Sequence, residues 1–126
     1  KLYRNGAALS LTYATPEIPS TISDLSGSDF YIGMEQGGHM EGYIDDVGLW
    51  DVALTAGAAN VLYNDGTPPD LKDNYGDYQS ADNLKGWWKM GDGDTHPTII
   101  DHSGSGYNGT MVNMSSGSFV TEVPTQ

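Results

Sequence analysis

Carboxylates are abundant in this chain and could do chemistry. The 126 residues carry 17 Asp and Glu against 5 Lys and Arg, which gives a formal net charge of −12. Carboxylate oxygens suit hard cations such as calcium, although an acidic surface more often serves solubility alone. A chain this acidic repels phosphate groups, so we expect neither nucleic acid nor an anionic membrane surface as a partner.

The arrangement of these carboxylates argues against catalysis. Hydrolysis of a glycosidic bond needs two carboxyl groups at a defined separation. Asp45 and Asp46 are adjacent on an expected strand, so their side chains diverge and cannot flank one bond. No nucleophile elbow, phosphate-binding loop or Ser/His/Asp arrangement is evident in the sequence, so we expect no enzyme. The glutamates are few and widely spaced, at Glu17, Glu35, Glu41 and Glu122.

Two further patterns resemble metal sites without completing one. Asp92-Gly93-Asp94 resembles the start of a calcium loop, but the later Asp/Asn-Gly and the distal Glu of an EF-hand are missing. We therefore expect a simple turn there. The three histidines show no metal-ligand spacing and stand in turn-like stretches, at His39, His96 and His102. With no cysteine in the chain, disulfides and thiolate ligands are excluded.

Tryptophans offer a different chemistry, because sugar faces pack on aromatic rings. Trp87 and Trp88 are adjacent on an expected strand, so one of them should point away from the core, and Tyr107 is a further stacking candidate. Trp50 invites the same interpretation. The alternative is that one ring of the pair belongs to the core and the other is covered by a loop or a neighbour.

Two sequons provide candidate modification sites. Asn108-Gly-Thr110 and Asn113-Met-Ser115 fit the N-glycosylation pattern. Such triplets also arise by chance in chains rich in Asn, Ser and Thr. Asn108 and Asn113 are therefore candidates only.

The elements that position these residues are mostly short strands. The length is that of about one domain, and 17 glycines indicate a turn-dense, all-β chain. The segment 40–51 is the longest strand-like run. Further strands are expected in a hairpin over 1–13 and over 29–34, 84–90, 98–114 and 118–123.

One helix is expected, at about residues 55–64. Thr55 can cap its first turn, and the alanines that follow favour helix. Asn64-Asp65-Gly66 ends it, and Pro68-Pro69 prevents its continuation.

The most specific stretch is "GYIDDVGLWDVALTAGAANVLYNDG" (42–66), which resembles the last strand and following helix of the laminin-G-like, concanavalin A-type jelly roll. "KLYRNG" (1–6) resembles the mid-domain hairpin of that family, and "FYIGM" (30–34) one of its strands. "NLKGWWKMGDGDTHPTIIDHSGSGYNGTM" (83–111) is similar to the start of the family's domain. Its "WWKMGDGDT" portion also resembles stretches of marine bacteriophage structural proteins.

This resemblance implies an all-β, two-sheet antiparallel jelly-roll sandwich whose halves stand in inverted order. Residues 1–66 would be the C-terminal half, 67–83 an acidic loop or linker, and 84–126 the strands that begin the domain. The segment 84–126 could fold back beside 40–51 of its own chain. Alternatively it could complete the sheet of a neighbouring copy, and such head-to-tail exchange generates rings or fibres.

Calcium is also implied by the resemblance. The family's calcium position corresponds here to Asp45 or Asp46, to Asp101, and to Asn108. The alternative is that Asp45 and Asp101 accept hydrogen bonds from turn amides.

The function implied is that of a non-catalytic structural protomer of a virion or extracellular filament. Its partners would be other copies of itself or sister virion proteins. The alternative is a calcium-dependent, carbohydrate-binding adhesion module, with glycans as ligands. Either would work outside the cell or on a virion surface. No apolar run approaches the roughly 20 residues of a membrane span, so we expect no membrane insertion.

Overall fold

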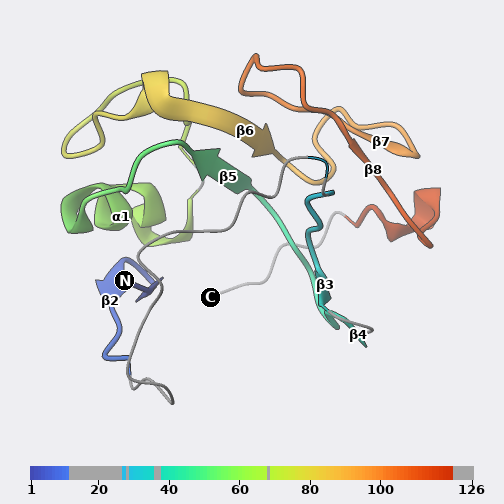
Figure 1. The fold of residues 1–126 in the computed structure, drawn as a ribbon, viewed down its shortest axis with the longest axis horizontal. Coiled ribbons are helices and arrows are strands. Elements are labelled where there is room, and N and C mark those ends of the chain that lie inside the picture. The colour runs from blue at the N-terminus through green and yellow to red at the C-terminus, as the bar shows by residue number, and fades with distance from the viewer. Residues whose placement is uncertain (12–26, 28, 36–37, 68, 121–126) are drawn as a thin grey trace.

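The computed structural model describes residues 1–126 apart from 12–26, 28, 36–37, 68 and 121–126. The described residues form a β-rich fold with one short α-helix, in which the strands pair antiparallel two by two (Figure 1). The pairs are β1 (Tyr3–Arg4) with β2 (Ala7–Ala8), β3 (Met34–Glu35) with β4 (Gly38–His39), β5 (Val47–Trp50) with β6 (Leu84–Trp88), and β7 (Thr98–Ile99) with β8 (Gly109–Thr110). The helices are α1 (Ala56–Tyr63) and three 3₁₀ turns, η1 (Asn64–Gly66), η2 (Ala81–Asn83) and η3 (Ser116–Ser118).

The β5–β6 pair is the centre of the fold. Its register places Val47 opposite Trp88 and Gly48 opposite Trp87, so residues 84–88 lie beside 47–50 of the same chain. On its other side β6 is bridged at Trp88 to Asp101. The backbone amide of His102 donates to the carbonyl of Trp87 at 2.7 Å. The strand β6 therefore has neighbours on both edges.

The run 40–51 is not one strand, contrary to the expectation. Only Val47–Trp50 is paired, and Asp46 before it has φ 46°, a left-handed conformation. Gly42 has φ 144°, which also departs from an extended strand. Asp tolerates the left-handed region better than most residues, because its short side chain can hydrogen-bond locally. The alternation of faces expected for this run therefore stops at Asp46.

The helix agrees with its sequence signals. The hydroxyl of Thr55 accepts from the amide of Ala58 at 3.0 Å, as an N-cap does. Asn64 ends the helix in a left-handed conformation, and its amide donates to the carbonyl of Asn60. The expected helix over about 55–64 is confirmed to within one residue at each end.

A small apolar core is built around β6. Leu84 and Trp87 pack with Leu71, and the partly buried Trp50 and Leu62 complete the cluster. Tyr78 is fully buried, and its hydroxyl donates to the carbonyl of Leu71 at 2.7 Å and accepts from the indole of Trp50 at 2.9 Å.

The described residues of segment 67–83 form turns and η2, and they pack against the rest of the fold. The segment supplies Leu71 and Tyr78 to the core, and Tyr75 forms an isolated bridge with Tyr78. The last expected strand, 118–123, begins inside η3, and its residues 121–123 lie outside the described residues.

Both central strands carry a glycine two residues before a tryptophan. In β5 the Trp50 ring lies over Gly48, and in β6 the Trp88 ring lies over Gly86. A Cβ atom at either glycine would overlap the ring that covers it. The absent side chain at each glycine thus creates the space that an indole fills.

Candidate functional site

Asp101 is the most fully engaged of the residues expected to bind metal. Its side chain is buried (7% exposed) and accepts three backbone amides. Oδ1 receives those of Trp87 and Ser103 at 3.0 and 2.9 Å, and Oδ2 receives that of Tyr107 at 2.9 Å. The Asp101 amide in turn donates to the side-chain oxygen of Asn108 at 2.9 Å. Asp101 therefore fastens the loop 101–108 to β6.

The protonation of Asp101 follows from these contacts. Burial alone would raise the pKa of its carboxyl group. Hydrogen bonds from the Ser103 side chain and from the amides of Trp87, Ser103 and Tyr107 outweigh burial and hold the pKa below its usual range. The hydrogen-bonding role weighed against calcium is thus formed here, and the three backbone amides alone occupy about three of the carboxylate's four acceptor positions.

Asp46 contacts β6 from the edge opposite Asp101. Its Oδ1 accepts the indole N–H of Trp87 at 2.7 Å. Its own amide donates to Oδ1 of Asp45 at 3.0 Å, so Asp45 also has a turn-amide partner. Burial raises the pKa of Asp46, the negative charges of Asp45 and Asp92 add to this rise, and the Trp87 hydrogen bond and Lys89 oppose it.

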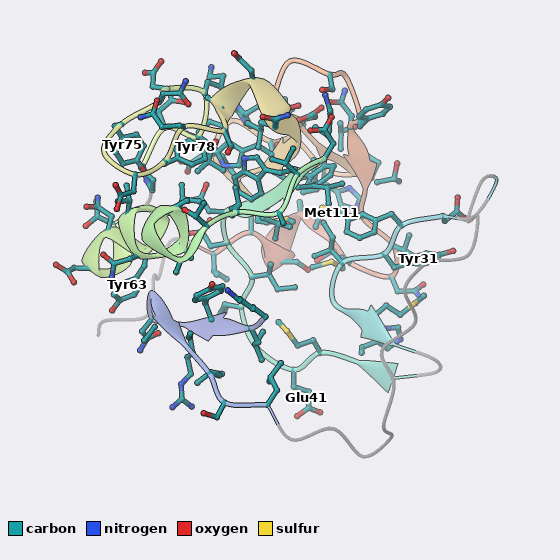
Figure 2. All side chains as sticks on the ribbon, turned by 60° about the vertical axis from the view of Figure 1, so that its left-hand side comes forward. Tyr31, Glu41, Tyr63, Tyr75, Tyr78 and Met111 are labelled. Atoms are coloured by element: carbon teal, nitrogen blue, oxygen red, sulfur yellow. The ribbon has the colours of Figure 1, made fainter. Side chains whose placement is uncertain are left out.

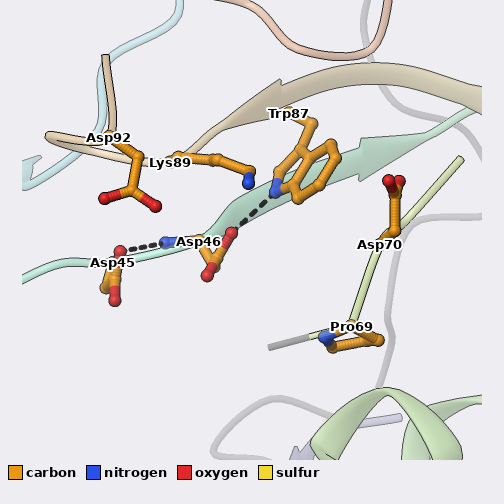
Figure 3. A pocket seen from close by; sticks show the side chains of 7 residues that line it. All are labelled: Asp45, Asp46, Pro69, Asp70, Trp87, Lys89 and Asp92. Carbon is orange, nitrogen blue, oxygen red and sulfur yellow. Dashed lines mark hydrogen bonds between the residues drawn. The ribbon is translucent and has the colours of Figure 1, made fainter. Parts of the chain in front are cut away.

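These aspartates line a shallow pocket of about 380 Å³. Figure 3 shows the Lys89 ammonium between Asp92 and the Trp87 ring, and it lies 4.7 Å from the centre of that ring. Four carboxylates and one ammonium give the pocket a negative charge. Its lining consists of Asp45, Asp46, Pro69, Asp70, Trp87, Lys89 and Asp92.

The structure only partly brings together the set expected for calcium. Asp101 and Asn108 are hydrogen-bonded to each other, while Asp45 and Asp46 stand at the pocket. Trp87 connects the two sides, with its amide on Asp101 and its indole on Asp46. Within the described residues, no three His, Asp or Glu side chains are grouped to hold a metal ion.

Both tryptophans of β6 are packed into the protein. Trp87 is 2% exposed and stacks edge-on with His102 at 5.9 Å between ring centres. Trp88 is 7% exposed, its ring lies 6.1 Å from that of Phe30, and its indole donates to the carbonyl of Tyr107 at 2.8 Å. Of the three expected sugar-stacking residues, only Tyr107 presents an open ring, at 66% exposure.

The turn residues behave as the sequence suggests. Asp94 accepts the amide of Ile100 at 2.7 Å, which is a turn contact. His96 makes a ring contact of 3.2 Å with the carbonyl of Met114. Asn108 and Asn113 are both exposed, although the side chain of Asn108 is already bonded to Asp101.

Large apolar side chains are exposed in two segments, 30–43 and 107–120. The segments meet at Trp88, since Phe30 packs on its ring and the Tyr107 carbonyl binds its indole. Figure 2 shows Tyr31 and Met111 on the same side of the molecule, away from α1. We call this set the apolar surface: Phe30, Tyr31, Met34, Met40, Tyr43, Tyr107, Val112, Met114 and Val120.

Charge is unevenly distributed around this surface. Residues 103–121 contain no Asp, Glu, Lys or Arg, although the chain carries a net charge of −12. Neither this neutral stretch nor the apolar surface is among the sites expected from the sequence. The neutral stretch can be found in the sequence, whereas exposure of its apolar side chains depends on the fold.

Comparison of the chain with protein-family models, with curated proteins and with solved structures finds no significant match. Among the described helices, none has the length and apolar character to cross a membrane.

Proposed function

We propose that this chain is a non-catalytic structural protomer that assembles with other copies of itself through the apolar surface. The observation that carries this is the exposure of nine large apolar side chains in two segments that meet at Trp88. Exposed apolar side chains that gather into a patch are typical of interaction sites. The resemblance of residues 87–95 to stretches of marine bacteriophage structural proteins supports the same role, and so does the resemblance of the chain to the laminin-G-like jelly roll. Together these resemblances add the finer proposal of a two-sheet sandwich on a virion or extracellular filament.

The charge distribution supports self-association. Two acidic copies repel each other in most orientations. The neutral stretch 103–121 adds no carboxylate to the apolar surface, whereas the segment 30–43 includes the exposed Glu41. Two copies that meet through the neutral stretch therefore avoid placing carboxylates against each other. Burial of apolar side chains there is worth about 25 cal/mol per Å² removed from water.

Strand exchange is a second mode of the same assembly. The β5–β6 register could form between copies as well as within one chain, and the hinge would then lie in the connection between these two strands, residues 51–83. In the structure the β5–β6 pair forms within one chain and the apolar surface stays exposed. Association through that surface therefore neither requires strand exchange nor excludes it. The two modes differ in whether the ion pair of Lys85 with Asp51 forms within one chain or between two.

Light scattering coupled to size exclusion tests the proposal. The wild type should show a mass that rises with concentration, and Val112→Asp/Met114→Asp should shift it to the monomer, because charges enter the neutral region. Leu2→Asp/Val52→Asp is the matched control, since both residues are exposed and apolar but lie outside the apolar surface. A wild type that stays monomeric at every concentration would refute self-assembly.

The adhesion module is the alternative, and the exposed ring of Tyr107 favours it. Tyr107 follows Ser103 in the loop that Asp101 fastens, so its ring has a fixed base from which to stack on a sugar. A glycan array read with and without calcium is the test. Binding that needs calcium and disappears in Tyr107→Ala supports the module, and an array without such binding excludes it.

A further inference from the structure

All of the sulfur in this protein is methionine. The chain has five methionines and no cysteine, so an oxidant of sulfur can act only at a thioether. Three of the five belong to the apolar surface: Met34 is 43% exposed, Met40 is 51% exposed and Met114 is 53% exposed. The other two, Met90 and Met111, are partly buried. The thioethers that an oxidant in solution reaches most easily therefore belong to the apolar surface.

The backbone at these three positions is tied to neighbouring segments. Met34 lies in β3, which pairs with β4. The amide of Met40 donates to the carbonyl of Gly33 at 2.9 Å, and the carbonyl of Met114 lies 3.2 Å from Nε2 of His96. A change confined to a thioether therefore alters the surface and leaves these backbone contacts in place.

Peroxide oxidises a thioether by transfer of one oxygen atom. The sulfur lone pair attacks a peroxide oxygen, and an S–O bond forms as the O–O bond breaks. The departing hydroxide takes the proton of the transferred oxygen and leaves as water. The sulfur loses two electrons and the peroxide gains them. The product is methionine sulfoxide, which is polar where the thioether was apolar.

We infer that oxidation of Met34, Met40 and Met114 by peroxide separates the copies of this protein from one another. The inference rests on the self-assembly proposed above and names its regulation. A sulfoxide buried between two copies loses its hydrogen bonds to water, and burial of a polar group without a new partner is unfavourable. Oxidised copies therefore stay apart. Because enzymes reduce methionine sulfoxide back to methionine, the change is reversible.

The coupling acts in both directions. Association buries the same three thioethers, so copies within an assembly are protected from peroxide and free copies are not. Met90 is partly buried and lies outside the apolar surface, so its oxidation should not depend on association. It is the internal reference for the other methionines.

The experiment treats the wild type with hydrogen peroxide, stops the reaction with catalase, and measures mass against concentration by light scattering coupled to size exclusion. Peptide mass spectrometry of the same samples gives the oxidised fraction of each methionine. In dilute, unassociated protein, Met34, Met40 and Met114 should oxidise about threefold or more faster than Met90. Their complete oxidation should raise the midpoint concentration of association by about tenfold or more. Methionine sulfoxide reductases for both epimers should restore the original midpoint.

Two variants divide the five methionines between them. Met34→Leu/Met40→Leu/Met114→Leu keeps apolar side chains of similar volume, so it should assemble as the wild type does and stay assembled in peroxide. Met90→Leu/Met111→Leu keeps the three exposed thioethers, so it should come apart in peroxide as the wild type does.

The outcomes separate this inference from the proposed function. A wild type that is monomeric before peroxide is added refutes self-assembly and the inference with it. A wild type that stays assembled with all three thioethers oxidised, or a triple variant that still comes apart in peroxide, overturns the inference alone. Oxidation of the three no faster than that of Met90 overturns it too. Circular dichroism of the oxidised protein should stay native, and its loss would assign dissociation to unfolding and overturn the inference.

Discussion

Trp87 contacts separate parts of this protein through its backbone, its indole N–H and its ring. Its amide binds Asp101, its carbonyl accepts from His102, and its indole N–H binds Asp46. The ring is buried against Leu71 and Leu84. One residue therefore couples the loop 101–108, the start of β5 and the core.

Removing the Asp101 carboxylate should be among the most damaging single changes. Asp101→Ala leaves three backbone amides without an acceptor in a buried place, and each such group costs about 1–3 kcal/mol. We expect the free energy of unfolding to fall by about 3 kcal/mol, measured by urea denaturation. Asp92→Ala, which removes an exposed carboxylate, should change it by less than about 0.5 kcal/mol. Equal losses in the two variants would contradict the role given to Asp101.

The two aspartates around Trp87 should give opposite pH dependences. Asp46 has a raised pKa in the folded state, so the fold gains stability as pH falls through that value toward the unfolded value of about 3.9. Asp101 has a lowered pKa, so its contribution is present above about 3.9 and is lost as pH falls through the folded value. Stability should therefore peak at mildly acidic pH.

Asp46→Asn tests the first half of that profile. The amide oxygen can still accept the Trp87 indole, but it no longer titrates. Unfolding free energies measured across the acidic and neutral range should lose the rise on acidification and keep the fall at the acidic end. A rise that persists in this variant would assign it to another group.

At the scale of elements, the pairing of β5 with β6 is the central feature. Lys85 and Asp51 flank this pair, with their charged groups 3.0 Å apart and both side chains about half exposed. Such an exposed ion pair adds little stability. The ion pair is useful as a chemical marker, because a covalent link between Lys85 and Asp51 shows whether β5 and β6 belong to the same chain.

Zero-length carbodiimide coupling should join Lys85 to Asp51 within one chain. Unlabelled and ¹⁵N-labelled protein are mixed, refolded together and coupled, and the linked peptide is weighed by mass spectrometry. Pairing within the chain gives peptides of a single isotope, whereas strand exchange gives mixed ones. Lys85→Arg, which lacks the reactive amine, is the control. Mixed peptides at the statistical proportion would identify strand exchange as the mode of assembly.

Gly86 should tolerate no side chain. Gly86→Ala places a methyl group against the Trp88 ring, and overpacking of this kind costs about 1–3 kcal/mol. Lys85→Ala, one residue earlier and exposed, should cost less than about 0.5 kcal/mol. Thermal unfolding followed by circular dichroism compares the two. A Gly86→Ala variant as stable as the wild type would contradict the packing of Trp88.

Local signals explain which elements could be predicted from the sequence. The helix α1 could be predicted because residues that commonly cap helices, Thr55 and Asn64, stand directly before and after it in the sequence. The strand over 84–88 was predictable from its apolar run. The break at Asp46 was not, because a polar residue in an alternating pattern does not reveal a left-handed backbone. The pocket beside Trp87 depends on contacts between segments that are distant in sequence, so no local sequence pattern predicts it.

At the scale of the whole molecule, charge is unevenly distributed along the chain. Four of the 17 acidic residues line the pocket beside Trp87, while residues 103–121 carry no formal charge. Repulsion between copies is thus long-ranged and their attraction is short-ranged. The balance between the two should depend on salt.

Association should strengthen as ionic strength rises. At 0.01 M salt the screening length is about 30 Å, and at 1 M it is about 3 Å, so salt removes repulsion but leaves apolar contact intact. Sedimentation velocity at low and high sodium chloride measures the effect. Association that weakens with salt would mean that ion pairs, rather than the apolar surface, hold the copies together.

The glycine–tryptophan stacking in β5 and β6 has a spectroscopic consequence. A proton held above an aromatic ring feels that ring's induced magnetic field and resonates upfield. The α-protons of Gly48 and Gly86, each covered by an indole, should therefore stand apart from those of the other glycines. Because the two indoles come from paired strands, the two signals should move together when the sheet opens, which makes them internal reporters of whether each copy is closed.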